Sequence, residues 1–186
     1  MIRQTLVIFF VFTALIGFCS YETIAQTSES HPNSKLFPAK GHKEVAILKR
    51  KDVSADTLKT LLIVPNTTSW IEIGKKINFF KEVMTITELQ KEIIAKGLSD
   101  KIPSISDRIG LYNACINYKP FVLLSVSGED LKTQGFRTRL SLYDPIRSDI
   151  IFKNEVRLNL MWEGYSEQKI LYPLLNSLVD YLNEQK

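Results

Sequence analysis

Histidine and cysteine are the side chains most often used for catalysis and metal binding near neutral pH, and this chain of 186 residues contains only two of each. The histidines, His31 and His42, lie near the N-terminus, in or beside a polar segment that is not expected to join the core. A Ser-His-Asp triad needs an imidazole beside its nucleophile, so we do not expect one. Cys115 stands among apolar residues of a predicted helix, and this setting favours a buried, inert thiol.

Metal ions and nucleotides have recognisable sequence patterns, and these are missing here. Structural zinc needs four Cys or His ligands and catalytic zinc usually three, but after residue 25 the chain has only His31, His42 and Cys115. No glycine-rich phosphate loop of the form G-x-G-x-x-G or G-x-x-x-x-G-K-S/T occurs. We therefore expect no metal, no nucleotide and no other cofactor.

Paired carboxylates can do acid-base chemistry without histidine. Six acidic residues lie near the ends or outer faces of predicted strands: Glu129, Asp130, Asp144, Asp149, Glu155 and Glu163. One alternative function is therefore a histidine-free hydrolase that cleaves glycans with two carboxyl groups. Turns and exposed strand positions also favour such residues for solubility alone, so we do not expect an enzyme.

A row of cations and aromatic residues is the strongest candidate for a binding surface. It comprises Arg137, Arg139, Tyr143, Lys153, Arg157 and Trp162, with Tyr165 nearby. Binding surfaces often combine these residue types. A secreted protein that binds a polyanion is a second alternative, but nucleic acid is not the expected partner at a net charge of +4. The competing interpretation is a water-facing sheet surface with cross-strand pairs, such as Glu155 with an arginine.

Residues 1–25 have the order of a secretory signal peptide, with Arg3 before the apolar run 6–18 and a polar segment after it. That run would rise only about 20 Å as a helix, short of the roughly 30 Å of a bilayer core. We expect export to the periplasm with cleavage after Ala25. Lipidation of Cys19 and anchoring to the outer membrane is the alternative, although Phe18 stands where a small residue is usual.

Residues 26–43 are rich in Ser, Pro, Lys and Thr and predict a flexible tether, which leaves residues 44–186 as one domain. The apolar run 61–64 predicts a central strand buried on both faces. Apolar spacing predicts a helix over 68–79, and a second short strand follows at 80–84. Thr85 and Glu88 have capping-box spacing for a helix that ends at Gly97.

The second half predicts one more internal helix, three strands and a final helix. Ser104 or Ser106 is expected to cap the internal helix, whose buried stripe is Ile105, Ile109, Tyr112 and Ile116. Residues 121–126, 137–143 and 152–160 predict consecutive antiparallel strands, the last two buried on one face. The final helix follows Ser166 and runs to about residue 184, with Pro173 either bending it or marking a late start.

This order predicts a single compact α/β (α+β) domain. It has a mixed sheet with helices packed on it and antiparallel strands in the C-terminal half.

The order of motifs also resembles a bacterial envelope superfamily. The segments that match are 80–84 (FKEVM), 88–94 (ELQKEII), 97–98 (GL), 140–144 (LSLYD) and 150–152 (IIF), within about residues 58–160. The superfamily includes the amino-terminal domain of the Tol-system propeller protein, the curli secretion lipoprotein and the lipoprotein activators of penicillin-binding proteins. Three of its features are replaced here, by residues 117–120, by Ser125 or Ser127, and by residues 148–149. The resemblance implies an exported, non-enzymatic adaptor that docks to envelope machinery.

Taken together, these features predict a protein that binds cell-envelope proteins in the periplasm and has no catalytic activity. Contact with the membrane is expected only through a lipid anchor at Cys19.

Overall fold

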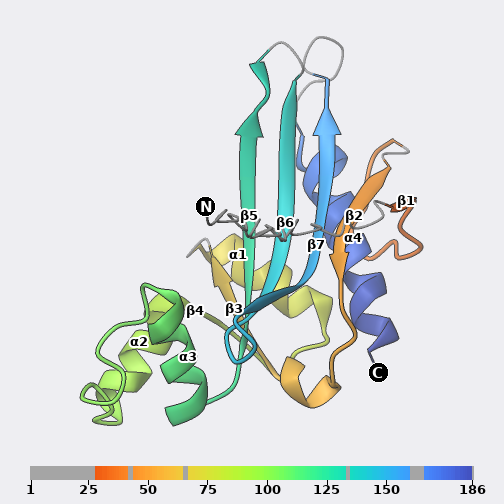
Figure 1. The fold of residues 1–186 in the computed structure, drawn as a ribbon. Helices are drawn as coiled ribbons and strands as arrows, with labels where there is room; N and C mark the ends of the chain where they lie inside the picture. The colour runs from red at the N-terminus through yellow and green to blue at the C-terminus, as the bar shows by residue number, and fades with distance from the viewer. Residues whose placement is uncertain (1–27, 42–43, 65–66, 133–134, 160–165, 186) are drawn as a thin grey trace, which may run out of the picture.

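Seven strands form one mixed sheet in the order β1-β2-β7-β6-β5-β3-β4 (Figure 1). The computed structural model describes residues 28–41, 44–64, 67–132, 135–159 and 166–185. The strands are β1 (Ser28–Ser30), β2 (Val45–Arg50), β3 (Thr60–Val64), β4 (Glu82–Thr85), β5 (Val122–Asp130), β6 (Phe136–Asp144) and β7 (Asp149–Leu158). The predictions on residues 1–27, 42–43 and 160–165 lie outside the described residues, and these include Cys19, Trp162, Glu163 and Tyr165.

The sheet has a parallel part and an antiparallel part. Strand β3 pairs in parallel with β4 and β5, whereas β5, β6 and β7 form an antiparallel meander. This confirms the antiparallel C-terminal half. Strand β3 is buried on both faces, as expected, but it lies second from an edge of the sheet and not at its centre.

Four α-helices cover the sheet from both sides: α1 (Thr68–Ile77), α2 (Ile86–Ala95), α3 (Arg108–Asn117) and α4 (Glu167–Glu184), together with the short 3-10 helix η1 (Ala55–Leu58). Side chains alternate along a strand, so neighbouring residues of β3 enter different cores. Leu61 and Ile63 pack with α4 and α1, and Leu62 packs with α2 and α3. The result is a single mixed α/β domain with two apolar cores, which confirms the predicted fold class.

Helix starts show which local signals decided the structure. The capping box at α2 is present, because Glu88 N–H donates to the Thr85 hydroxyl and Thr85 N–H donates to the Glu88 carboxylate. The predicted cap of α3 was wrong. Asp107 is the N-cap, and its Oδ1 accepts from Gly110 N–H at 2.8 Å. Ser104 and Ser106 instead bond to each other through their hydroxyls at 2.8 Å.

Helix α4 begins directly after Ser166, so Pro173 lies within the helix and does not mark its start. The Ser166 side chain makes no capping hydrogen bond. Proline has no N–H to donate to the preceding turn. In that turn the Gln168 carbonyl accepts from the Lys40 N–H at 2.9 Å, which ties the N-terminal part of the domain to α4.

Residues 31–41, here called the strap, differ from the predicted flexible tether because they lie along α4. Asp180 accepts from Asn33 N–H and Ser34 N–H at 2.7 and 2.8 Å. Phe37 is only 2% exposed and belongs to the core. The strap therefore belongs to the folded domain, although its composition resembles a linker.

Candidate functional site

The predicted row of cations lies on the side of β5, β6 and β7 opposite α4. Along β6, Thr138, Leu140 and Leu142 are buried and face α4, so the alternating residues Arg137 and Arg139 face the other way. The strand register places Arg137 beside Arg157 and Arg139 beside Glu155. The sheet thus brings the three arginines together, as the alternation predicted.

Two carboxylates occupy these arginines. Glu155 is buried between them, and it accepts from Arg139 Nε at 3.1 Å and from Arg157 Nε at 3.0 Å. Glu129 Oε2 lies 3.0 Å from Arg139 Nη1 and 3.3 Å from Arg137 Nη1. Burial alone raises the pKa of Glu155, but the bonds from Arg139 and Arg157 and the charge of Arg137 outweigh it and lower the pKa. The cross-strand pairing considered for this row is therefore present, and it removes much of its positive charge.

The remaining predicted members of the row do not join this network. Tyr143 lies beside the start of α3, where the Arg108 guanidinium is 5.8 Å from its ring centre, and its hydroxyl lies 3.2 Å from that of Ser148. Lys153 is half-buried on β7 next to Ser141 in the register. Arg137, Arg139 and Arg157 form one cluster, and Tyr143 and Lys153 lie apart from it.

The carboxylates considered for hydrolysis have structural partners. Lys49 and Lys51 both bind Asp149, and their hydrogen bonds lower its pKa to about 2. Asp144 is buried in the β6–β7 turn and accepts from Ile146 N–H at 2.9 Å, and Asp130 accepts from Lys132 N–H at 2.8 Å. The arginine cluster brings Glu129 and Glu155 together, but the lowered pKa of Glu155 is opposite to what a general acid requires.

Cys115 is buried, as expected, and its Sγ donates to the Phe121 carbonyl at 3.7 Å. Burial raises the pKa of this thiol to about 12, so it stays protonated at neutral pH. Within the described ranges, no group of three His, Cys, Asp or Glu side chains is placed to hold a metal ion. No helix in the same ranges is long and apolar enough to cross a bilayer.

An apolar surface on α3 is the main feature that the sequence interpretation missed. Ile109, Tyr112 and Ile116 were expected to be buried, but they are 73%, 43% and 56% exposed. They recur at steps of three and four residues, so they share one face of the helix. The opposite face packs Leu111, Ala114 and Cys115 into the core. Helix α3 is therefore apolar on two sides, and its spacing could not show which side turns inward.

Gly110 explains which side of α3 is buried. A Cβ at this position would lie 2.1 Å from the carbonyl oxygen of Ser104, so only glycine allows the helix to pack this closely on the preceding loop. That close contact sets the rotation of α3. As a result, Leu111 turns inward and Ile109 turns outward.

Helix α2 extends this apolar surface. Ile94 is 61% exposed, although the neighbouring Ile93 is buried in the core that α2 shares with α3. Tyr118, at the end of α3, donates its hydroxyl proton to Glu92 Oε2 at 2.7 Å and so joins the two helices. Figure 1 shows α2 and α3 together at one end of the domain. We call Ile94, Ile109, Tyr112 and Ile116 the α2–α3 face.

A small cavity opens beside Ile94, between α2 and the loop that leads to α3. Its volume is about 140 Å³, and it is lined by Gln90, Ile93, Ile94, Ser99, Ile102, Pro103, Ser104 and Ile105. Most of these side chains are apolar. An engineered cavity of about 150 Å³ in another protein accepts benzene, so the space beside Ile94 suits one apolar side chain.

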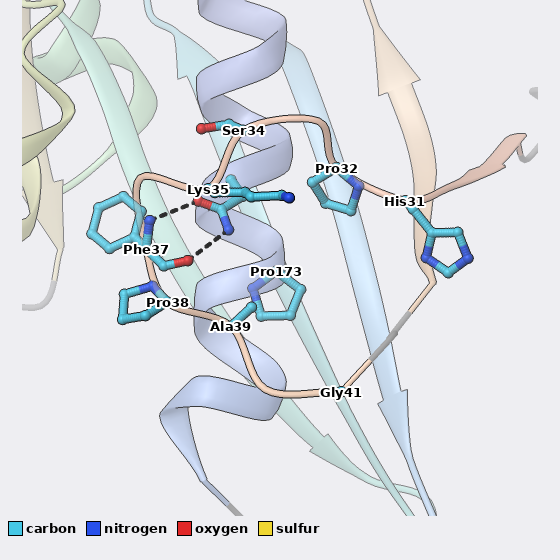
Figure 2. A pocket seen from close by; sticks show the side chains of 10 residues that line it. His31, Pro32, Ser34, Lys35, Phe37, Pro38, Ala39, Gly41 and Pro173 are labelled. Carbon is cyan, nitrogen blue, oxygen red and sulfur yellow. Dashed lines mark hydrogen bonds between the residues drawn. The ribbon is translucent and has the colours of Figure 1, made fainter.

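A larger cavity lies between the strap and α4, and Figure 2 shows its lining side chains. Its volume is about 390 Å³, and Pro32, Pro38 and Pro173 form much of its apolar wall. Two of its lining residues also hold the strap in place, because Asn176 forms hydrogen bonds with the backbone of Phe37. This cavity is thus a by-product of the way the strap crosses α4.

Comparison of the chain with protein-family models, with curated proteins and with solved structures gave no match.

Proposed function

We propose that this protein is an exported binding module of the cell envelope, and that it holds a partner protein on the α2–α3 face. The observation that carries the proposal is α3 itself, which exposes Ile109, Tyr112 and Ile116 while its other side is already in the core. A helix that is apolar on all sides is normally covered. Exposed apolar surface backed by a rigid core is also what protein-binding sites present.

The order of residues 1–25 supports export, and the order of elements supports an adaptor role. Strand β3, α1, β4, α2, α3 and the β5–β7 meander follow one another as in the envelope superfamily that the sequence resembles. We infer from that resemblance a periplasmic location, with the outer membrane as the site of anchoring if Cys19 is lipidated. Intact-mass measurement of the exported protein tests this part. Cleavage after Ala25 is expected, and a diacylglycerol adduct on Cys19 identifies the lipoprotein alternative.

The two alternative functions have less support. A glycan hydrolase needs one carboxyl group with a raised pKa, whereas the arginines lower that of Glu155. A polyanion-binding protein needs free cations, whereas Glu129 and Glu155 occupy the arginine cluster.

A photo-reactive amino acid placed at position 112 tests the docking face in living cells. We expect irradiation to join the protein covalently to a cell-envelope protein, which mass spectrometry then identifies. The same amino acid at position 36 is the control, because Leu36 is 37% exposed but lies on the strap, on the opposite side of the sheet. Capture of only cytoplasmic proteins, or equal products from both positions, contradicts the proposal.

A further inference from the structure

We propose that the partner presents an acidic amphipathic helix to the α2–α3 face. This inference rests on the proposed function and adds the chemistry of the partner. Three observations support it: the spacing of the exposed side chains, the cavity beside Ile94, and an excess of cations around the face.

The spacing suits one helix. Ile109, Tyr112 and Ile116 span two turns of α3 and form a single ridge along it. Ridges of this kind pack into the grooves of a second helix at an interaxial distance of about 8–10 Å. Helices that bind in this way place apolar anchors at positions i, i+3, i+4 and i+7. The 140 Å³ cavity beside Ile94 gives one such anchor a place to be buried.

The charges around the face indicate an acidic partner. Four cations lie on or next to α2 and α3, and none of them forms an ion pair in the part of the chain that the structure describes: Lys91, Lys96, Lys101 and Arg108. Two of them contact aromatic rings, Lys96 at 5.9 Å from Tyr118 and Arg108 at 5.8 Å from Tyr143. Their charges remain available to a partner.

Most carboxylates of the same region already have partners. Glu88 completes the capping box of α2, and Asp107 caps α3. Glu92 accepts from Tyr118 and lies 2.7 Å from Lys119 Nζ. Asp100, in the loop, is the one that remains exposed. The four cations thus face solvent beside an apolar ridge, and complementary charge on a partner would be acidic.

A lipid surface also attracts apolar and basic residues, but the geometry favours a helix. An interfacial helix buries a wide apolar face, whereas the exposed side of α3 has one ridge of three apolar residues next to Asn113 and Asn117. The other side of α3 packs on the core, so the helix cannot roll into a membrane.

Direct binding of designed peptides tests the inference. The probe is a fluorescent helical peptide of about 18 residues, with leucines along one face and glutamates beside them. A second peptide has lysine in place of each glutamate. Anisotropy titrations use the exported chain, and vesicles of phosphatidylglycerol serve as the membrane probe. We expect the acidic peptide to bind, the basic peptide and the vesicles to bind at least about tenfold more weakly, and added salt to weaken the complex.

Matched variants locate the site. We expect the double variant Ile109→Ser, Ile116→Ser to weaken binding of the acidic peptide by about tenfold or more. The variant Leu36→Ser should bind as the parent chain does. The double variant Lys96→Glu, Arg108→Glu should shift the preference toward the basic peptide. Circular dichroism of each variant verifies that it is folded.

Several results would overturn the inference. Equal binding of both peptides removes the role of charge, and stronger binding to the vesicles assigns the face to a membrane. Dimerisation that the Ile109→Ser, Ile116→Ser variant abolishes assigns it to a second copy of the chain. If position 112 captures an envelope protein in cells but the acidic peptide does not bind, the proposed function stands and the acidic helix is wrong.

Discussion

The side-chain amide of Asn176 binds both backbone polar groups of Phe37. The Phe37 N–H donates to Oδ1, the Nδ2 group donates to the Phe37 carbonyl, and both distances are 2.9 Å (Figure 2). The Phe37 ring lies 5.7 Å from that of Tyr172, one turn earlier in α4. Together with Asp180 one turn later, these residues line one face of α4 at four-residue steps. An apparently unstructured segment is thereby fixed along a helix.

Removal of this amide should destabilise the domain. In Asn176→Ala, the buried N–H and carbonyl of Phe37 lose their partners, and we expect the free energy of unfolding to fall by about 1–3 kcal/mol. Phe37→Ala should lower it by about 3–5 kcal/mol, because a buried ring is lost. Urea denaturation followed by circular dichroism measures both. The exposed neighbour Leu36 is the control, and a loss in Leu36→Ala as large as that in Phe37→Ala would contradict this account.

The exposed residues of α3 should matter little for folding. We expect Ile109→Ser to change the free energy of unfolding by less than about 0.5 kcal/mol, since surface positions tolerate substitution. Leu111→Ala, on the buried side of the same helix, should cost about 2–5 kcal/mol. Thermal denaturation of the two variants compares them directly. Equal losses would mean that α3 is rotated from the position described.

Gly110 should be intolerant of a side chain. In Gly110→Ala the new methyl group meets the Ser104 backbone carbonyl, which has no flexible end to move aside. We expect a loss of about 1–3 kcal/mol in stability, as for other overpacked sites. Gly97→Ala is a useful comparison, because its cost comes from a φ of +65° and not from a contact. Chemical denaturation that leaves Gly110→Ala unchanged would refute the close approach.

Acid should weaken the domain partly through Glu155. Its pKa is lowered from an ordinary 4.5 in the folded state, so it stabilises the protein above that pH, and the contribution is lost as pH falls through the lowered value. We expect Glu155→Gln to cost about 1–3 kcal/mol at pH 7 and to make stability depend less on pH in the acid range. Urea unfolding at several pH values measures this. Glu72→Gln, which alters an exposed pair with Lys75, should leave the pH profile unchanged.

The thiol of Cys115 should be silent until the protein unfolds. Its pKa of about 12 and its burial keep the reactive thiolate scarce and out of reach at pH 7. We expect a thiol-specific reagent to label the native exported chain at a small fraction of the rate seen in denaturant. Labelling at the same rate in both conditions would show that the thiol is exposed.

Local signals predicted several elements because the interactions that form them are close in the chain. Thr85 and Glu88 are three residues apart and complete a capping box wherever a helix follows. The alternation of residues 137–143 showed which face of β6 is buried, since side chains of a strand point to opposite sides in turn. The apolar run of β3 likewise predicted burial on both faces.

Two features could not be found in this way. The strap looks like a linker because its own residues have little apolar periodicity, and its partners on α4 lie about 140 residues further along the chain. The docking face depends on the rotation of α3, which is apolar on two sides, so its spacing is equally compatible with burying Ile109 or Leu111.

The amino-acid sequence alone determined the class of fold, the meander and the buried cysteine, because periodicity and capping act over a few residues. Only the tertiary structure decided how much charge the arginine cluster keeps, since the register places Glu155 beside Arg139. It also decided which apolar residues stay in water. The close contact between Gly110 and Ser104 turns one apolar side of α3 into the core and leaves the other exposed.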